Sequence, residues 1–192
     1  MENTLYLLTG AAGFLGSNVS RSLIAQNKKV RTLVLKGDPM KKHVPKEAEI
    51  VDGDLLDTNS LEVFFSVPEN TEIIVLHCAS MVTVSPDLTP KLRAINVEGT
   101  RNVINKCVEH KVKKLVYVSS TGAIPELPKG QAITEPASFD PDLVVGGYSK
   151  TKAEATQLVL DAIAAKKSTR QLCILAEFAD QTTMETDTSL IL

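Results

Sequence analysis

Two residues that could move a proton together stand one helical turn apart in the segment GYSKTKAE at 147–154. Tyr148 and Lys152 have i,i+4 spacing, which on a helix places both side chains on one face. A free tyrosine has a pKa of about 10 and is a poor base near neutral pH, but a neighbouring ammonium favours the phenolate and lowers that pKa. The pair could therefore act in general acid/base catalysis, with the tyrosine moving the proton. The same spacing taken alone is more typical of an ordinary pair on a helix surface.

Hydroxyl side chains end an apolar run upstream of this pair. The segment VYVSSTGAIP at 116–125 places Ser119, Ser120 and Thr121 directly after a predicted strand. A hydroxyl in this position could hold a substrate oxygen beside the tyrosine. Together with a glycine-rich turn further upstream, this order of motifs favours the catalytic interpretation of the Tyr–Lys pair.

Three regularly spaced glycines follow the first apolar run, in LYLLTGAAGFLGSNV at 5–19. Gly10 permits a tight turn, Gly13 lets a pyrophosphate approach the backbone, and Gly16 lets helix and strand pack closely. The helix that follows would offer free N–H groups and the positive end of its dipole to phosphate. The GxxGxxG spacing between a strand and a helix thus predicts dinucleotide binding, with a purely structural turn as the alternative.

The charged residues after the second predicted strand bear on which dinucleotide binds. An acidic residue there would accept the ribose 2′-hydroxyl of NAD, whereas a basic one would pair with the 2′-phosphate of NADP. The segment LKGD at 35–38 offers Lys36 at that place and Asp38 two residues later. Lys36 favours NADP over NAD, and the alternative is that both charges are solvated in a loop.

Hydrophobic periodicity indicates the elements that must position these motifs. Apolar runs predict strands at 4–8, 30–35, 49–51, 73–76 and 115–118, and helical spacing predicts helices at 14–26, 59–66, 88–110 and 148–167. Residues 121–147, rich in Pro and Gly, are predicted to form a long loop, of a length that in a compact domain is usually either functional or disordered. Strands that alternate with helices predict an α/β fold: a Rossmann-type, doubly wound parallel sheet covered on both faces.

Composition narrows the classes of partner. The 192 residues carry a net charge of -2, contain no Trp and only 4% aromatic residues, and show no basic stripe, so nucleic acid is not expected. Cys78, Cys107 and Cys173 are far apart, which indicates neither a disulfide framework nor a zinc site, and no metal is predicted. Without a leader or an apolar run of about 18 residues, a cytoplasmic protein with no membrane partner is expected.

Six motifs together resemble the extended short-chain dehydrogenase/reductases of the NAD-dependent epimerase/dehydratase type, most closely the dihydroflavonol-reductase-like branch. The resemblance covers residues 4–166 and rests on TGAAGFLG at 9–16, DGDLLD at 52–57, HCAS at 77–80, NVEGTRNV at 96–103, VYVSST at 116–121 and YSKTKAE at 148–154.

The resemblance implies a role for each matching residue. Tyr148 would be the catalytic acid/base, Lys152 would bind the nicotinamide ribose, and Thr121 would take the place of the catalytic Ser/Thr. Asn96 would be structural or a proton relay. No chemistry is assigned to His77, which is expected to be a packing or surface residue. With Lys36 added from the strand end, the predicted cofactor-binding set is Gly10, Gly13, Phe14, Leu15, Gly16, Lys36, Asp54, Leu55, Ala79, Ser80, Ser119, Tyr148 and Lys152.

The family pattern stops near Lys167, which divides the chain into a predicted NAD(P)-binding Rossmann domain at 1–167 and a tail at 168–192 that lacks family motifs. A shifted reading frame would explain the break, because the back-translated tail can be read two bases out of phase as a family-like Gly-Pro-Asn-Asp segment. A natural alternative tail is the competing hypothesis. Either way, the C-terminal substrate region is expected to be largely missing.

These inferences predict an NAD(P)-dependent oxidoreductase that transfers a hydride at a carbonyl or alcohol carbon, with Tyr148 moving the proton. The first alternative is a nucleotide-sugar epimerase or dehydratase with tightly held NAD. The second is a dinucleotide-binding fragment without catalysis. The expected partner is a small-molecule carbonyl, alcohol or nucleotide sugar, and a homodimer is left open.

Overall fold

The computed structural model describes residues 3–134, 136–165 and 171–177, the last of these as backbone only. Its centre is one parallel sheet of six strands in the order β3-β2-β1-β4-β5-β6. The strands are β1 Thr4–Thr9, β2 Lys29–Val34, β3 Glu49–Asp52, β4 Glu72–His77, β5 Lys114–Ser120 and β6 Gln171–Glu177. The order reverses between β1 and β4, which is the point where open α/β sheets bind ligands.

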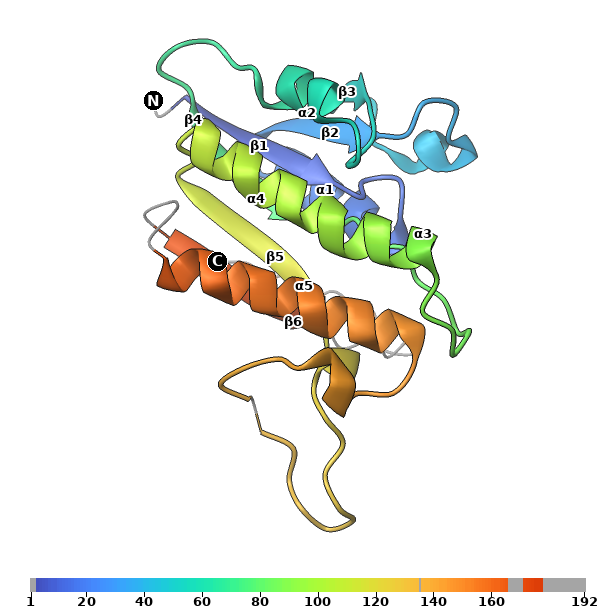
Figure 1. The fold of residues 1–192 in the computed structure, drawn as a ribbon. Coiled ribbons are helices and arrows are strands. Elements are labelled where there is room, and N and C mark those ends of the chain that lie inside the picture. Colours follow the sequence, from blue (N-terminus) through green and yellow to red (C-terminus); the bar gives the residue numbers. More distant parts are fainter. Residues whose placement is uncertain (1–2, 135, 166–170, 178–192) are drawn as a thin grey trace.

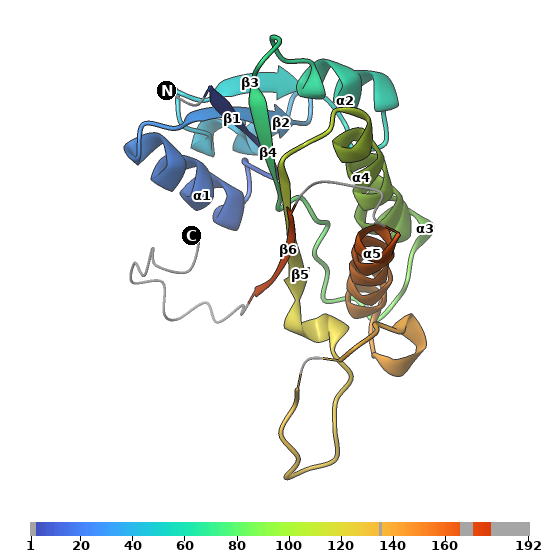
Figure 2. The same cartoon turned by 90° about the vertical axis from the view of Figure 1, so that its left-hand side faces the viewer.

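Helices cover both faces of this sheet, so the predicted Rossmann-type α/β fold is confirmed (Figures 1 and 2). Helix α1, Phe14–Ala25, lies on one face. The opposite face carries α2 Thr58–Phe65, α4 Gly99–Glu109 and α5 Gly147–Ala164, with the short α3 Pro90–Arg93 at one end of α4. Among the described helices, none is both long and apolar enough to cross a membrane.

The apolar core has two layers because the central strands are buried on both sides. Leu7 and Val75 point toward the layer beneath α2, α4 and α5, whereas Leu8 and Leu76 point toward the layer beneath α1. All four side chains are at most 5% exposed. Alternate residues of one strand therefore fill opposite layers, as expected for a covered parallel sheet.

The helix predicted at 88–110 is present but is not continuous in type. A π-helical turn, Ala94–Glu98, separates α3 from α4 and contains Asn96. Such turns are rare and occur frequently at functional sites. The helical spacing of apolar residues does not reveal a π turn, because one wider turn changes the periodicity only locally.

The predictions for the C-terminal segment are tested only in small part. The sequence suggests a strand at 171–175, and β6 is there, paired in parallel with β5. The domain boundary at 167 and most of the tail fall on residues 166–170 and 178–192, outside the described part of the chain. The division into 1–167 and 168–192 and its frameshift explanation stay predictions.

Candidate active site

The glycine turn brings three backbone segments into close contact at the carboxyl end of β1. Gly10 has φ +77°, and a Cβ built on it would lie 2.7 Å from the backbone nitrogen of Ala79. A Cβ on Gly16 would lie 2.2 Å from the carbonyl oxygen of Gly10. The turn thus holds the start of α1 and the end of β4 closer to β1 than any side chain permits. Gly13 precedes α1 as its N-cap and gives no side-chain cap, which leaves N–H groups of the first turn for a ligand.

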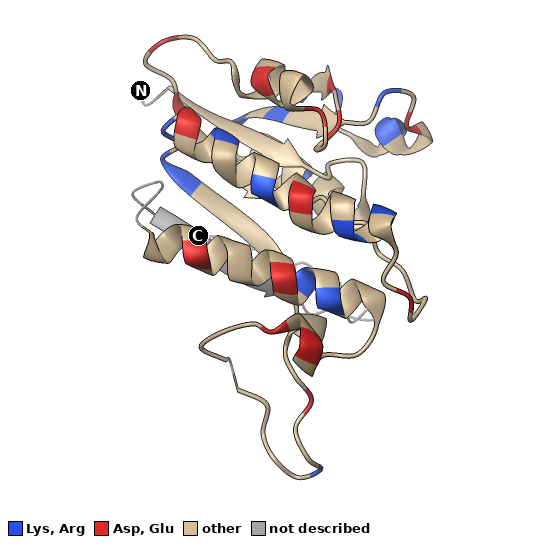
Figure 3. Ribbon diagram, viewed as in Figure 1, with Lys and Arg blue, Asp and Glu red and all other residues tan. Residues whose placement is uncertain are grey.

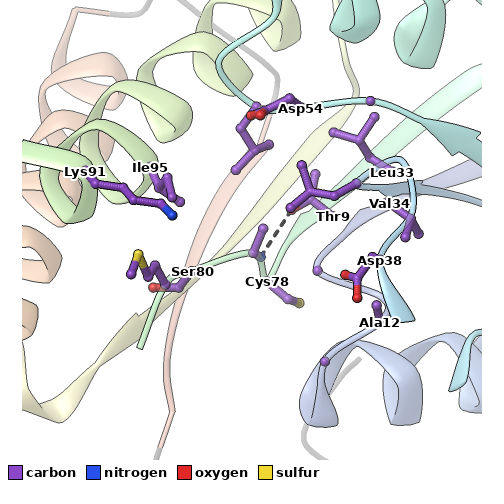
Figure 4. Close-up of a pocket in the computed structure, with 17 residues that line it drawn as sticks. Thr9, Ala12, Leu33, Val34, Asp38, Asp54, Cys78, Ser80, Lys91 and Ile95 are labelled. Atoms are coloured by element: carbon purple, nitrogen blue, oxygen red, sulfur yellow. Dashed lines mark hydrogen bonds between the residues drawn. The ribbon is translucent and has the colours of Figure 1, made fainter. Parts of the chain in front are cut away.

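A cavity of about 420 Å³ opens beside this turn, at the ends of β1, β2 and β4 (Figure 4). Six residues of the predicted cofactor-binding set line it: Gly10, Gly13, Asp54, Leu55, Ala79 and Ser80. Asp38 also lines the cavity, whereas the predicted Lys36 is not among the lining residues and is exposed. We call this space the outer cavity.

The outer cavity also has lining residues that the sequence reasoning missed. Leu33 and Val34 of β2 supply apolar wall, and Lys91 and Ile95 reach the space from α3 and the π turn (Figure 4). Helical periodicity between 88 and 110 could have placed Lys91 and Ile95 on one helix face. It could not have shown which cavity that face approaches, because the distance to β2 depends on the tertiary fold.

A second space of about 180 Å³, the inner cavity, joins the glycine turn to the Tyr–Lys pair. Its lining residues include Tyr148 and Lys152 of α5, together with the predicted Phe14, Leu15, Gly16 and Ser119. It shares Gly10, Gly13, Cys78 and Ser80 with the outer cavity. The two cavities therefore line one edge of the sheet, and motifs more than 130 residues apart meet there.

The hydroxyls after β5 have different surroundings. Ser119 is buried and its Oγ lies 2.6 Å from Oγ1 of Thr156, which donates its own proton to the Lys152 carbonyl. The Ser119 hydroxyl must then be the donor to Thr156. Thr121 begins a 3₁₀ turn, is exposed, and is not among the residues that line either cavity. The structure thus brings Ser119, but not Thr121, to the wall of the inner cavity.

Lys152 is held inside the protein rather than on its surface. The residue is 3% exposed, and its Nζ donates a hydrogen bond of 2.7 Å to the Val118 carbonyl. The same ammonium lies 4.5 Å from the centroid of the Tyr117 ring. The surface-pair alternative for Tyr148 and Lys152 therefore does not describe this site, because the ammonium of Lys152 is buried beside β5.

His77 links β1, β4 and α4 behind the outer cavity. Thr100 donates to the Asn96 carbonyl and so accepts from His77 Nε2 at 3.0 Å. The Ala79 N–H donates to Thr9 Oγ1, and the Thr9 hydroxyl lies 2.7 Å from His77 Nδ1. These contacts define a neutral ring with its proton on Nε2. Burial, reinforced by the charge of Lys152, lowers the pKa of His77 to about 3.

Asn96 uses both ends of its amide within the protein. Its Oδ1 accepts from the Met81 N–H and the Ser80 hydroxyl, and its Nδ2 donates to the Met81 carbonyl and to Oγ1 of Thr151. These bonds tie the segment after β4 to α5, and with it Ser80 to the helix that carries Tyr148. Because its donors and acceptors are engaged, the geometry favours the structural alternative for Asn96 over the proton relay.

Charged residues near the site also help to hold its elements together. Basic and acidic residues are interspersed along α4 and α5 (Figure 3). Arg93, next to the π turn, makes a bidentate pair with Glu154 of α5. Glu154 raises the pKa of Arg93 through this hydrogen-bonded contact. The pair joins the α3–π segment, which lines the outer cavity, to the helix that lines the inner one.

Comparison with known proteins identifies a family and several relatives that the chain matches. Residues 7–176 match the model of the 3-beta hydroxysteroid dehydrogenase/isomerase family. The chain is 30% identical over 167 residues to 3 beta-hydroxysteroid dehydrogenase type 7 of Mus musculus, which covers 82% of this chain and 44% of that protein. It is 36% identical over 130 residues to cinnamoyl-CoA reductase 1 of Oryza sativa, covering 64% of this chain and 36% of that protein. The chain thus spans less than half the length of these relatives.

Solved structures show the same fold. The crystal structure of gox2253 superposes with a TM-score of 0.76 at 31% identity, over 88% of this chain and 50% of that chain. A UDP-glucose 4-epimerase of Thermus thermophilus in complex with NAD gives a TM-score of 0.73 at 26% identity, over 89% of this chain and 54% of that chain. The resemblance that the sequence motifs predict is confirmed.

Proposed function

We propose that this chain, which belongs to the 3-beta hydroxysteroid dehydrogenase/isomerase family, is an oxidoreductase that acts on an alcohol or carbonyl carbon. The observation that carries the proposal is the inner cavity, where the glycine turn lies in one wall and Tyr148 and Lys152 in another. A dinucleotide suits this edge of the sheet, because the glycine turn lines both cavities and presents the start of α1 there without a side-chain cap on its N–H groups. When bound, its nicotinamide would supply or accept a hydride.

The chain's own residues supply binding and proton transfer. The turn at Gly10 and Gly13 would hold the pyrophosphate with backbone N–H groups, and Asp54 and Leu55 would lie against the adenine. Tyr148 would give a proton to, or take it from, the substrate oxygen. The buried ammonium of Lys152 would favour the phenolate form of Tyr148 and hold a ribose hydroxyl. Ser119, whose proton is donated to Thr156, would offer lone pairs to the cavity.

The substrate class that we propose is an alcohol or ketone on an apolar skeleton. Val82 lines the inner cavity together with Tyr148 and is 70% exposed. Val84, two residues after Val82, and Val145, three residues before Tyr148, are also exposed. Apolar side chains at the open side of a polar site favour an apolar ligand. The relatives of the chain include a 3 beta-hydroxysteroid dehydrogenase of Mus musculus and a sterol-4-alpha-carboxylate 3-dehydrogenase of Saccharomyces cerevisiae, and their names support the same class.

The decisive experiment is a titration of the 192-residue chain with NADH and NADPH, followed by nicotinamide fluorescence, and then a turnover assay with apolar secondary alcohols and ketones. Saturable binding of either cofactor with turnover supports the proposal. Binding without turnover on any substrate favours the non-catalytic alternative. NAD that co-purifies and does not exchange favours the epimerase alternative. The structural similarity to the NAD-bound epimerase of Thermus thermophilus is the reason for testing this alternative.

Tyr148→Phe is expected to lower turnover by about 100-fold or more, because the variant loses the proton donor while keeping the ring. NADH affinity is expected to change little. Tyr6→Phe is the matched control, since Tyr6 lies in β1 and packs toward the α1 layer, away from both cavities. Equal turnover in Tyr148→Phe and Tyr6→Phe would remove Tyr148 from the mechanism.

The cofactor preference that we propose is NAD(H), although Lys36 taken from the sequence favours NADP. The carboxylate of Asp38 lines the outer cavity, and Lys36 does not (Figure 4). A carboxylate accepts from a ribose hydroxyl and repels a 2′-phosphate. The Asp38 side chain also accepts from the Met40 N–H at 2.8 Å, which fixes its position.

Asp38→Asn is therefore expected to strengthen NADPH binding by about tenfold while changing NADH affinity less, since it removes the like-charge repulsion. The amide oxygen can still accept from the Met40 N–H, so the local turn is retained. Lys36→Met is the control, and both cofactors should bind it as they bind the wild type. A selective loss of NADPH affinity in Lys36→Met would instead establish the preference that the sequence favours. Fluorescence titration of the three proteins measures both effects.

A further inference from the structure

The ammonium of Lys152 has an aromatic surface beneath it. Lys152 Nζ lies 4.5 Å from the centroid of the Tyr117 ring, and donates to the Val118 carbonyl one residue along the same strand. Removing an ammonium from water is costly unless polar partners replace the water. A carbonyl oxygen and the electron-rich face of a ring are two such partners. Both come from β5, so this strand helps to determine where the ammonium lies.

The Tyr117 ring is itself fixed from behind. Tyr117 is 1% exposed, and its ring centroid lies 5.7 Å from that of His77 with an angle of 34° between the planes. His77 is held through both ring nitrogens by Thr9 and Thr100. The three side chains therefore form a continuous stack, His77–Tyr117–Lys152, that runs from β4 through β5 to α5.

The hydroxyl group of Tyr117 does not explain why this residue lies between His77 and Lys152. Its oxygen is buried beside the hydroxyls of Thr100 and Thr156 and forms no hydrogen bond of good geometry among the described residues. The neighbouring hydroxyls of Thr100 and Thr156 donate their protons to backbone carbonyls. Burial raises the pKa of Tyr117, so the group stays neutral and is no second acid/base. A buried unpaired hydroxyl gives no net stability, and the ring is the part that contacts the site.

We propose that Tyr117 is a positioning residue, whose ring face holds the Lys152 ammonium at the wall of the inner cavity where Tyr148 also lies. The inference rests on the proposed function in that Lys152 is taken to contact the cofactor and Tyr148. Loss of the ring would free the ammonium to move toward solvent and weaken both contacts. A cation–π contact of a desolvated cation corresponds to an effect of about tenfold on affinity.

The first test compares Tyr117→Leu with Tyr117→Phe by NADH titration. The leucine variant removes the ring and is expected to weaken NADH binding by about tenfold, whereas the phenylalanine variant retains the ring and the affinity. The comparison is repeated in a Lys152→Met background, where Tyr117→Leu should have no further effect. An equal loss of affinity in both backgrounds would mean that Tyr117 only fills the core, and would overturn the proposal.

The second test needs no cofactor. The Hε protons of Lys152 in the free protein should show an upfield ring-current shift by NMR, which Tyr117→Phe retains and Tyr117→Leu abolishes. Wild-type Lys152 protons at ordinary shifts would overturn the proposal even if the leucine variant fails to fold. The upfield shift in a protein that binds neither NADH nor NADPH would refute the proposed function and leave the positioning of Lys152 by Tyr117 established.

Discussion

Gly10→Ala is expected to destabilise the fold by about 3 kcal/mol or more and to abolish NADH binding, whereas Gly37→Ala should cost only about 1 kcal/mol. The two glycines share φ +77°, so the backbone penalty of a Cβ is the same at both. They differ in the space that is available for a Cβ. A Cβ on Gly10 would lie 2.7 to 2.8 Å from backbone atoms of Cys78 and Ala79, and a Cβ on Gly37 would meet nothing within 4 Å.

The difference between these variants measures the close approach of β1 and β4. Backbone atoms cannot rotate away from the new methyl as a flexible side chain can, so the end of β4 must move. Movement there displaces Ala79 and Ser80, which line the outer cavity. Urea unfolding gives the stability of each variant and NADH titration gives its affinity. If Gly10→Ala loses no more stability than Gly37→Ala, the two strands are not held together as the structure describes.

Acidification is expected to destabilise the protein through His77. Its pKa is lowered to about 3 in the fold from an ordinary value of 6.5, so the unfolded chain binds a proton that the fold excludes. The stabilisation is therefore complete above pH 6.5 and is lost progressively as the pH falls toward 3. The full loss is on the order of 5 kcal/mol, of which about one third falls between pH 6.5 and 5, above the range where most carboxylates titrate.

His77→Gln should remove this part of the pH dependence, because it keeps a donor and an acceptor but does not titrate there. Urea unfolding at pH 5 and 6.5 compares the change in stability within each protein, which allows for a lower overall stability of the variant. His43→Gln is the matched substitution at an exposed position of the 3₁₀ turn, and a pH dependence that persists in it but is lost in His77→Gln assigns the effect to His77. In wild-type protein, an NMR titration that shows His77 protonated at pH 5 would contradict the prediction.

Much of the fold can be predicted from the sequence because its signals are local. Apolar runs between turn residues place five strands, and the GxxGxxG spacing places the turn between β1 and α1. The helix over 88–110 is predicted in extent, but the π turn that presents Asn96 is not. Periodicity reports which residues face the core, and it does not report the long-range bonds from Asn96 to Met81 and Thr151.

The candidate site, like the fold, can be predicted from the sequence only in part. By itself, the sequence determined the residue types available: a glycine turn, an i,i+4 Tyr–Lys pair, a run of hydroxyls and two opposite charges after β2. Only the tertiary structure decided which of them meet: Ser119 rather than Thr121 at the inner cavity, Asp38 rather than Lys36 at the outer one, and Tyr117 beneath Lys152. The reason is physical, because neighbours in sequence point in different directions at a strand end. Their surroundings are supplied by elements far along the chain that only sheet order brings together.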